Sequence, residues 1–174
     1  MPEAIELILV RHAKAEQRDP VSQPDDSARR LTESGRRKMR EAAAGLSRIL
    51  SGVDWIITSP YARAAETAEI LAPALSPGGG AQLPVDTCKE LCPGGSVNAL
   101  LAFLRKRPER RRIVLVGHDT DLSEMAAALI GARECDGLEL KKGGGCLIRF
   151  DEGFALGAGQ LIWWLTPSIL RALD

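Results

Sequence analysis

The 174-residue sequence contains two histidines, and each follows an apolar run. The run 7–10 stops at Arg11 and His12, and the run 113–116 leads to His118. A buried strand that ends in polar residues delivers them to the C-terminal edge of an open α/β sheet, which is where such sheets bind ligands. We therefore expect both histidines at that edge, where a neutral imidazole can act as a nucleophile.

A third polar residue occupies an equivalent place. Arg63 follows the apolar run 53–58 and a Ser59-Pro60 exit, in the first turn of an expected helix. Because the strand exits of a doubly wound sheet share one edge, Arg11, Arg63 and the histidines can converge although they are far apart in sequence. Two arginines suit bidentate recognition of phosphate oxygens, and a helix N-terminus adds donors. These residue types predict a phosphate pocket in which an imidazole attacks phosphorus.

Motifs of other chemistries are not found in the sequence. It has no G-x-x-x-x-G-K-[ST] or G-x-G-x-x-G loop for nucleotides, and no G-x-S-x-G or C-x-x-x-x-x-R element for a serine or cysteine nucleophile. The nearby carboxylates form no obvious cation cage, and the four cysteines lack paired C-x-x-C spacing, so we expect free thiols. We predict neither a metal nor another cofactor.

Composition limits the class of partner. Twenty-three basic residues balance 23 acidic ones, which argues against wholesale binding to nucleic acid or to a membrane surface. No apolar run approaches the roughly 18 residues of a membrane span, and residues 1–3 do not open a signal peptide. We expect a cytoplasmic protein, with a monomer favoured. The basic run 105–112 is either a solvated linker or a docking patch for an acidic protein.

The predicted elements that position these residues alternate along the chain. Periodicity and turn signals give the order β-α-β-α-β-α-β-α, followed by two strands that form a hairpin around 151–153. Helices are expected at 33–50 after a Thr32 N-cap, 61–73, 97–104 after a Ser96 cap, and 122–130; strands are expected up to residue 10 and at 53–58, 83–86, 113–116, 143–150 and 154–165. The polar segment 16–30 should lie over the surface near the first strand exit. This order predicts one domain, 1–174, with three α/β/α layers: a mostly parallel sheet with helices on both faces and an antiparallel edge.

Four motifs occur in order between residues 7 and 120: L-V-R-H-A-K-A, R-R-L-T-E-S-G, T-S-P-Y-A-R-A-A-E-T-A and V-G-H-D-T. Together they resemble the histidine phosphatase superfamily, also called phosphoglycerate mutase-like. The short length without an inserted cap is similar to its SixA-type phosphohistidine phosphatase branch. The resemblance implies that His12 is the nucleophile and forms a phosphohistidine intermediate that water hydrolyses. Arg11, Arg63 and His118 would surround the phosphoryl group.

The resemblance also implies a further phosphate ligand and a general acid. A family arginine precedes the L-T pair, and because R-P-L-T reads R-R-L-T here, either Arg29 or Arg30 fits; we assign Arg29. Larger members place a Glu or Asp after the third strand as the acid, where Glu90 lies here, with Asp119 as the weaker candidate. A phosphoramidate leaving group is an imidazole, which needs less help from an acid than an alkoxide does.

Two positions depart from the family pattern. Ala13 replaces a glycine, and Lys14 stands where many members carry an acid, which adds positive charge near the pocket mouth. We interpret both as variation in an active enzyme. The resemblance thus implies a metal-independent phosphatase for phosphohistidine of a signalling or phosphotransfer protein, and the absent cap favours so bulky a substrate. The alternatives are a small-molecule phosphomonoesterase of the same fold and a phosphate- or phosphoprotein-binding module without turnover.

Overall fold

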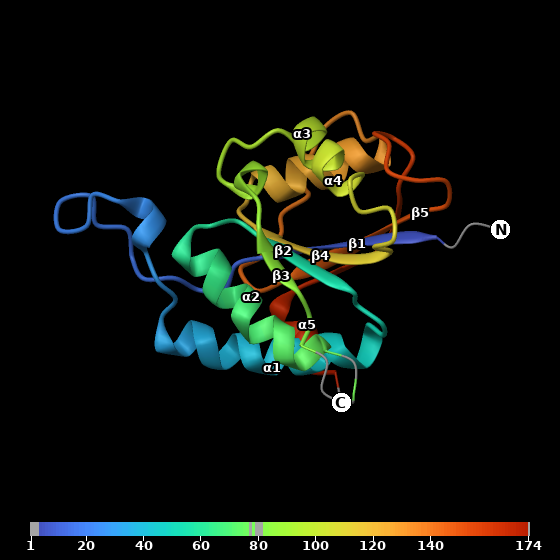
Figure 1. Cartoon of the computed structure of the whole chain (residues 1–174). Coiled ribbons are helices and arrows are strands. Elements are labelled where there is room, and N and C mark those ends of the chain that lie inside the picture. The colour runs from blue at the N-terminus through green and yellow to red at the C-terminus, as the bar shows by residue number, and fades with distance from the viewer. Residues whose placement is uncertain (1–3, 77, 79–81, 174) are drawn as a thin grey trace.

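A mixed sheet forms the centre of the fold (Figure 1). Within residues 4–76, 78 and 82–173, which the computed structural model describes, six strands lie in the spatial order β3-β2-β4-β1-β5-β6. They are β1 (Ile5–Arg11), β2 (Trp55–Thr58), β3 (Val85–Thr87), β4 (Arg112–Gly117), β5 (Gly145–Phe150) and β6 (Gln160–Leu165). Strands β1 to β4 pair in parallel, whereas β5 and β6 add an antiparallel edge. The predicted fold class is confirmed.

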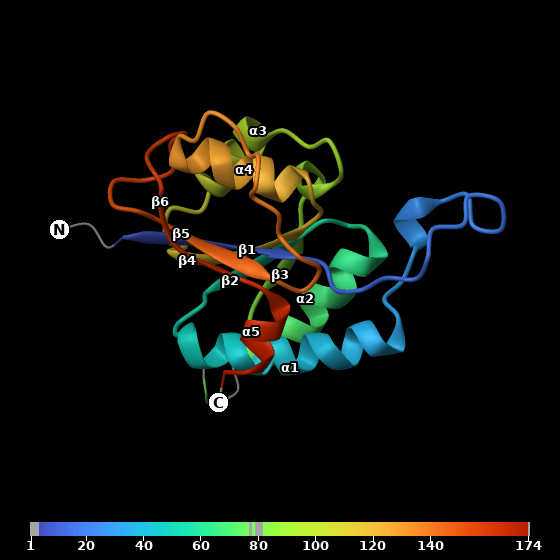
Figure 2. The same cartoon turned by 180° about the vertical axis from the view of Figure 1, so that it is seen from behind.

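Helices cover both faces of the sheet (Figures 1 and 2). One layer holds α1 (Glu33–Ile49), α2 (Ala62–Leu75) and α5 (Pro167–Arg171), and the other holds α3 (Val97–Leu104) and α4 (Asp121–Ile130). Successive residues of β1 alternate between the layers: Ile8 and Val10 pack into the first, and Leu7 and Leu9 into the second. An apolar run without polar interruption is what a strand buried on both faces requires. That burial holds β1, and so its polar end, in place.

The helix starts follow local sequence signals. Thr32 Oγ1 accepts the N–H of Gly35 at 2.9 Å, and Ser96 Oγ accepts the N–H of Ala99 at 3.3 Å, which confirms both predicted caps. The second helix was predicted to end at Pro73 but continues to Leu75. Leu75 is buried, so packing of the last turn outweighs the hydrogen bond that the proline removes.

The predicted tight turn of the C-terminal hairpin, at 151–153, is wrong. β5 ends at Phe150, but β6 begins only at Gln160, so residues 151–159 form a long connection. Phe154 was expected within a strand; instead its ring packs edge-on against Phe150, with the centroids 5.7 Å apart. An aromatic residue that is buried from a loop gives the same sequence signal as one in a strand. The short helix α5 was not predicted.

The polar segment 16–30 forms a lobe that projects from the body and returns to the start of α2 (Figure 1). Most of its residues are exposed or half-buried, as predicted, but its last part is ordered as two short features. One is the 3₁₀ helix η1 (Asp26–Ala28), capped by Asp25, whose side chain accepts the N–H of Ser27 at 2.9 Å. The other is an isolated bridge between Ala15 and Leu31. The lobe thereby closes back on the exit of β1.

Gly35 lets α1 approach this exit. A Cβ at Gly35 would lie 2.1 Å from the carbonyl oxygen of Lys14, which accepts the N–H of Thr32 at 3.0 Å. Gly35→Ala is therefore expected to displace that carbonyl and to lower the free energy of unfolding by about 2 kcal/mol in urea titrations. A Cβ at Gly78 meets nothing within 4 Å, so Gly78→Ala is the control. Equal losses in the two variants would contradict this reason.

Candidate active site

The C-terminal ends of β1 and β4 lie side by side in the sheet. At this point the helices that follow the strands change from one face of the sheet to the other. The register pairs Arg11 with Gly117, and the N–H of His12 donates to the carbonyl of Gly117 at 3.0 Å. The chain leaves β1 toward α1 on one face and leaves β4 toward α4 on the other (Figure 1). Such a switch point is the usual ligand site of an open α/β sheet. His12 and His118 are the residues that follow these two strands.

His12 is held in the tautomer that a nucleophile needs. It is only 5% exposed, with Nδ1 2.7 Å from the carbonyl oxygen of Ala13 and Nε2 3.3 Å from Nε of Arg63. A carbonyl only accepts and a guanidinium only donates, so the proton lies on Nδ1 and the lone pair lies on Nε2. A lone pair at Nε2 is what attack on phosphorus requires.

His118 lies beside His12, with the ring centroids 5.2 Å apart. Its Nε2 is 2.9 Å from Oγ of Ser59, the first residue after β2, and the ring of Tyr61 packs edge-on against it. Its Nδ1 is buried and has no hydrogen-bond partner among the residues that the structure describes. The exits of three neighbouring strands thus build this side of the site.

Burial keeps both imidazoles neutral. Burial, together with the charges of Arg63 and Arg11, lowers the pKa of His12 to about 3, although the bond to the Ala13 carbonyl acts in the opposite direction. Burial and the charge of Arg63 lower the pKa of His118 to about 4. Both side chains are therefore unprotonated at neutral pH, which leaves His12 reactive.

The lowered pKa values predict a loss of stability in acid. In the unfolded chain a histidine has a pKa of about 6.5, so below that pH the unfolded state binds protons that the folded state does not. The free energy of unfolding should therefore fall as pH drops from 7 to 5, by roughly 2 kcal/mol for each of these histidines. Urea titrations at both pH values measure this fall. The variant His12→Gln/His118→Gln should fall less, and an equal fall in both proteins would refute the assignment.

Arg63 is the buried cation beside the two histidines. It is 4% exposed and lies in the first turn of α2. Its Nη1 donates to the carbonyl of Asp26 at 2.8 Å, and its Nη2 lies 3.0 Å from the carboxylate of the same residue. The other carboxylate oxygen accepts Nε of Arg29 at 2.9 Å. Burial alone would raise the pKa of Asp26, but the charges of Arg63 and Arg29 outweigh it and lower that pKa. Asp26 therefore holds the two arginines together as an ionised bridge.

Sequence reasoning missed Asp26. It lies in η1, within a segment without periodicity, and a carboxylate there is usually solvated. The cap at Asp25 was a local signal that the segment is ordered. Which carboxylate then reaches Arg63 depends on how the lobe folds back, which no local pattern contains.

Arg11 precedes His12 at the end of β1. Its Nη1 donates to the carbonyl of Leu140 at 2.7 Å and is 3.7 Å from the carboxylate of Asp119, while its Nε is buried without a partner in the described chain. Asp119 also accepts the hydroxyl of Ser123. The weaker of the two acid candidates is thus a partner of Arg11.

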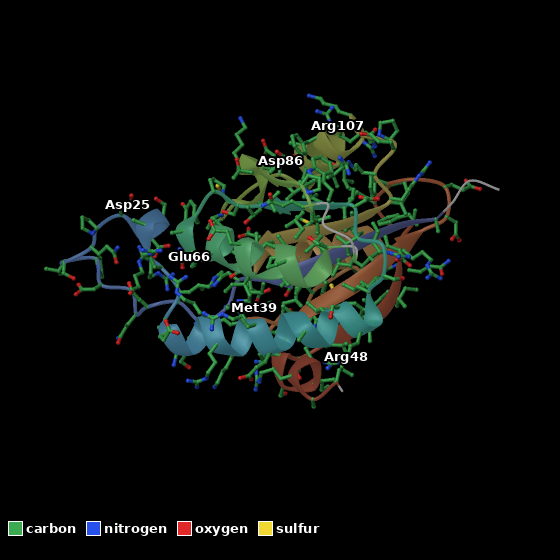
Figure 3. The ribbon with its side chains drawn as sticks, turned by 60° about the horizontal axis from the view of Figure 1, so that its bottom comes forward. Asp25, Met39, Arg48, Glu66, Asp86 and Arg107 are labelled. Carbon is green, nitrogen blue, oxygen red and sulfur yellow. The ribbon has the colours of Figure 1, made fainter. Side chains whose placement is uncertain are left out.

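The structure separates Arg29 from Arg30. Arg29 approaches the histidines through Asp26, whereas Arg30 is 65% exposed and pairs at 2.5 Å with Glu66 of α2. Glu66 is labelled in Figure 3. Glu90 stays a predicted acid: it follows β3, and Sγ of the nearby Cys92 is 3.9 Å from Oγ of Ser59. The carboxylate of Glu90 accepts the N–H of Ser96 at 3.5 Å, and within the described residues no hydrogen bond or ion pair joins it to either histidine. Its place after β3 matches the expectation, but the short helix η2 (Lys89–Leu91) turns it toward the following loop.

Ala13 fits where the family has glycine. Its N–H donates to Oγ1 of Thr67 at 3.1 Å, and that hydroxyl donates to the carbonyl of Arg63 at 2.7 Å. Among the described residues every positive φ belongs to a glycine, so Ala13 has an ordinary backbone conformation. The alanine therefore needs none of the freedom that glycine provides.

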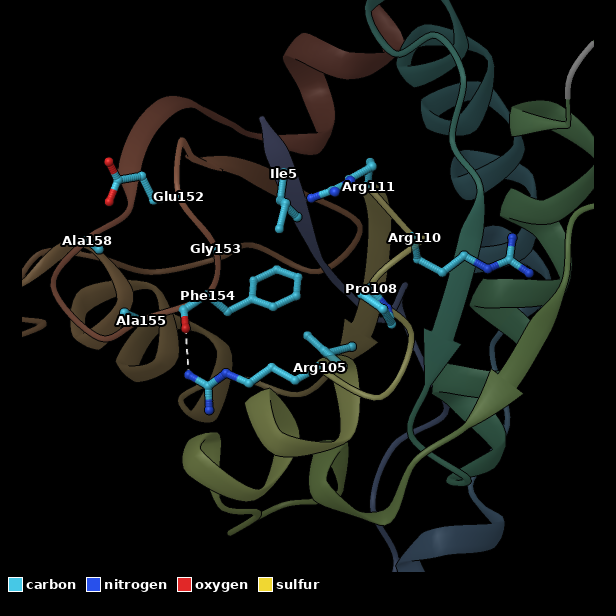
Figure 4. A pocket seen from close by; sticks show the side chains of 11 residues that line it. Ile5, Arg105, Pro108, Arg110, Arg111, Glu152, Gly153, Phe154, Ala155 and Ala158 are labelled. Carbon is cyan, nitrogen blue, oxygen red and sulfur yellow. Dashed lines mark hydrogen bonds between the residues drawn. The ribbon is translucent and has the colours of Figure 1, made fainter. Parts of the chain in front are cut away.

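A separate cavity of about 450 Å³ lies at the opposite edge of the sheet, by the start of β1 (Figure 4). It is about 20 Å along the strand from His12. Arg105 donates to the carbonyl of Phe154 at 2.5 Å, and Arg110 donates to that of Asp54 at 2.5 Å. Residues 105–109 are exposed, as expected of a solvated linker, and Arg105 and Arg110 also tie this linker to neighbouring loops. Docking of an acidic protein on this run stays a prediction.

Two structural expectations concern metals and membranes. Over the part of the chain that the structure describes, no group of three or more His, Cys, Asp and Glu side chains could hold a metal ion. In the same part of the chain, none of the helices is long and apolar enough to span a membrane. The four cysteines are free thiols, as predicted.

Comparison with known proteins gives a consistent result. The model of the histidine phosphatase superfamily (branch 1) matches residues 7–92. A protein of Picosynechococcus sp., described as uncharacterised, is 36% identical over 144 residues, which are 80% of this chain and 82% of that protein. The matched segment 7–92 includes Arg11, His12 and Arg63, whereas His118 lies beyond it.

Solved structures extend the similarity over the whole fold. The protein histidine phosphatase SixA complexed with tungstate has a TM-score of 0.79 at 22% identity, over 95% of this chain and 99% of that one. A putative alpha-ribazole-5'-P phosphatase from Escherichia coli has a TM-score of 0.71 at 19% identity, over 95% and 98%. With these matches added to the four motifs and to the two adjoining strand ends that carry the histidines, the chain belongs to the histidine phosphatase superfamily, branch 1.

Proposed function

We propose that this phosphatase removes the phosphoryl group from phosphohistidine of a signalling or phosphotransfer protein, without a metal, through a covalent intermediate on His12. The observation that carries the proposal is the state of His12. Its Nε2 lone pair lies at the switch point of the sheet, 3.3 Å from the guanidinium of Arg63, on an imidazole whose pKa is lowered to about 3. A buried neutral nucleophile beside fixed cations suits attack on an anionic phosphoryl group.

Two transfers complete the reaction. In the first, Nε2 of His12 forms a bond to phosphorus while the phosphorus–nitrogen bond of the substrate breaks, and the substrate imidazole leaves and takes up a proton. In the second, water attacks phosphorus, the bond to Nε2 breaks, and inorganic phosphate leaves. Arg63 and Arg11 offset the charge on the phosphoryl oxygens. When the Ser59 hydroxyl donates to Nε2 of His118, Nδ1 carries the proton and becomes a further donor.

The carboxylates of the site support a phosphoramidate substrate. Asp26 is ionised, because its arginine partners lower its pKa, and Asp119 is held beside Arg11. Glu90 is turned toward Ser96. Asp26, being ionised, is therefore not a ready proton donor for an alkoxide leaving group, whereas an imidazole leaves with less help. The name of the SixA neighbour, a protein histidine phosphatase, points to the same substrate class.

A small-molecule phosphomonoesterase is the second candidate. The Escherichia coli neighbour, described as a putative alpha-ribazole-5'-P phosphatase, has the same fold over nearly the whole chain. Such an enzyme would use the same nucleophile and arginines but would need a proton donor for the ester oxygen.

A substrate panel tests the proposal. Phosphate release is measured from a phosphorylated histidine domain and from sugar and nucleotide monophosphates, each with and without a chelator. We expect kcat/KM for the phosphohistidine domain to exceed that for the monophosphates by at least about tenfold, a margin of about 1.4 kcal/mol, with no effect of the chelator. Faster turnover of a monophosphate would favour the second candidate. Phosphate binding without release from any substrate would identify a binding module.

A further inference from the structure

We refer to His12, His118, Arg11 and Arg63 as the phosphoryl site. A narrow crevice of about 40 Å³ lies next to it, between the exit of β1, the first half of α1 and the loop before β5. Its rim carries four basic side chains: Lys14, Lys38, Lys142 and Arg171. Its floor includes Met39, whose position on α1 is labelled in Figure 3. We refer to these four side chains and the space between them as the cationic crevice. Its volume accommodates about three water-sized groups, which is the size of a carboxylate.

The positive charge of the cationic crevice is hardly compensated. Lys14, Lys38 and Lys142 are exposed, and none of them forms an ion pair with a residue that the structure describes. Arg171 is 3.7 Å from the carboxylate of Glu41, a pair exposed enough to contribute little. In a chain with zero formal net charge, four cations around one crevice are a local excess.

The backbone holds two of these lysines against the end of β1. The carbonyl of Lys14 accepts the N–H of Thr32 at 3.0 Å and is packed against Gly35. Lys142 precedes Gly143, whose N–H donates to the carbonyl of Arg11 at 3.1 Å. Both lysines therefore start from fixed positions next to the strand that delivers His12, and a ligand does not have to order their backbone.

The charges of the phosphoryl site act on a lysine of the cationic crevice. Burial, followed by the charges of Arg11, Arg29, Lys14 and Arg63, lowers the pKa of Lys142. The same proximity is seen in the backbone, where Gly143, the residue after Lys142, donates its N–H to the carbonyl of Arg11 at 3.1 Å. Two carboxylates beside the histidines, Asp26 and Asp119, are already paired with Arg63 and Arg11.

We infer that the cationic crevice binds a second anionic group of the substrate, a carboxylate or a phosphate, carried next to the phosphoryl group that His12 receives. The inference rests on the proposed phosphatase function and adds a substrate preference to it: the enzyme selects phosphorylated substrates with a second negative charge. That charge has two sources, an acidic side chain beside phosphohistidine in a protein or a second phosphate in a small molecule.

The test compares substrates that differ only in the second charge. One pair is a phosphohistidine peptide with aspartate or alanine beside the phosphohistidine, and the other is a sugar bisphosphate with the matching monophosphate. The variants are Lys14→Gln/Lys142→Gln and, as a control, Lys106→Gln, an exposed lysine outside the crevice. The readout is the ratio of kcat/KM within each pair.

We expect the native ratio to favour the substrate with the second charge in one pair, which identifies the source. The double variant should lose about tenfold of that ratio, roughly threefold per lysine, and Lys106→Gln should keep it. A native ratio near one in both pairs, or a ratio that the double variant retains, would overturn the inference.

A binding experiment tests the cationic crevice independently of whether the proposed phosphatase function is correct. Methylenebisphosphonate and methylphosphonate are titrated calorimetrically into the native protein and the double variant, which requires no turnover. Preferential binding of the bisphosphonate that the double variant loses supports the crevice, even when no substrate of the panel is hydrolysed. Equal affinities for the two phosphonates overturn it, even in an active phosphatase.

Discussion

Replacement of His12 by alanine is expected to lower the rate of phosphate release by at least about a thousandfold, because the reaction loses the atom that accepts the phosphoryl group. The Nε2 lone pair of His12 lies 3.3 Å from Arg63, and His118 does not take its place because its Nε2 is bound to Ser59. The measurement is kcat/KM for the phosphohistidine domain. A rate within about tenfold of the native rate would show that His12 is not the nucleophile.

Two controls keep this result interpretable. His12→Gln leaves less of a cavity than alanine does, and it should be equally inactive if nucleophilicity is what matters. Urea titrations of both variants at pH 7 test whether the fold persists. An inactive alanine variant with an active glutamine variant would indicate a packing effect instead of lost chemistry.

Arg63→Met is expected to lower kcat/KM by about a hundredfold, which corresponds to about 2.7 kcal/mol. The substitution removes a guanidinium that contacts Nε2 of His12 and is joined to Asp26 by two hydrogen bonds. It therefore removes the proposed phosphate ligand and leaves Asp26 to Arg29 alone. Steady-state rates with the phosphohistidine domain and calorimetric binding of inorganic phosphate should both show the loss.

Arg30→Met is the matched control for this prediction. Arg30 neighbours the site in sequence, but it is 65% exposed and pairs with Glu66. Its removal should change kcat/KM by less than about threefold, the range of an exposed ion pair. If Arg30→Met were as damaging as Arg63→Met, the assignment of Arg29 in place of Arg30 would fail.

The strand exits could be predicted from the sequence because their signal is local. An uninterrupted apolar run followed by Arg11 and His12 fixes both the burial of β1 and the display of its end, and His118 repeats the pattern. The caps at Thr32 and Ser96 are equally local, since each side chain bonds a backbone N–H three residues ahead. Side-chain types and their neighbours along the chain suffice for such features.

The remaining contacts of the site depend on long-range folding. The bridge formed by Asp26 exists because the lobe 16–30 returns to α2. The antiparallel pairing of β5 with β1 brings Lys142 close to the arginines of the site, whose charges lower its pKa. Phe154 carries a strand signal but is buried from a loop. For Asp26 and Lys142 the partner lies far along the chain, where periodicity and turn signals give no information.

Trapping of the phosphoenzyme shows whether His12 receives the phosphoryl group. The native protein is mixed with a phosphohistidine domain labelled on its phosphoryl group, quenched in alkali within milliseconds, and digested for mapping of the label. We expect a label that is stable to alkali and labile to acid, located on Nε2 of His12. No labelled enzyme during turnover, or a label on any other residue, would contradict it.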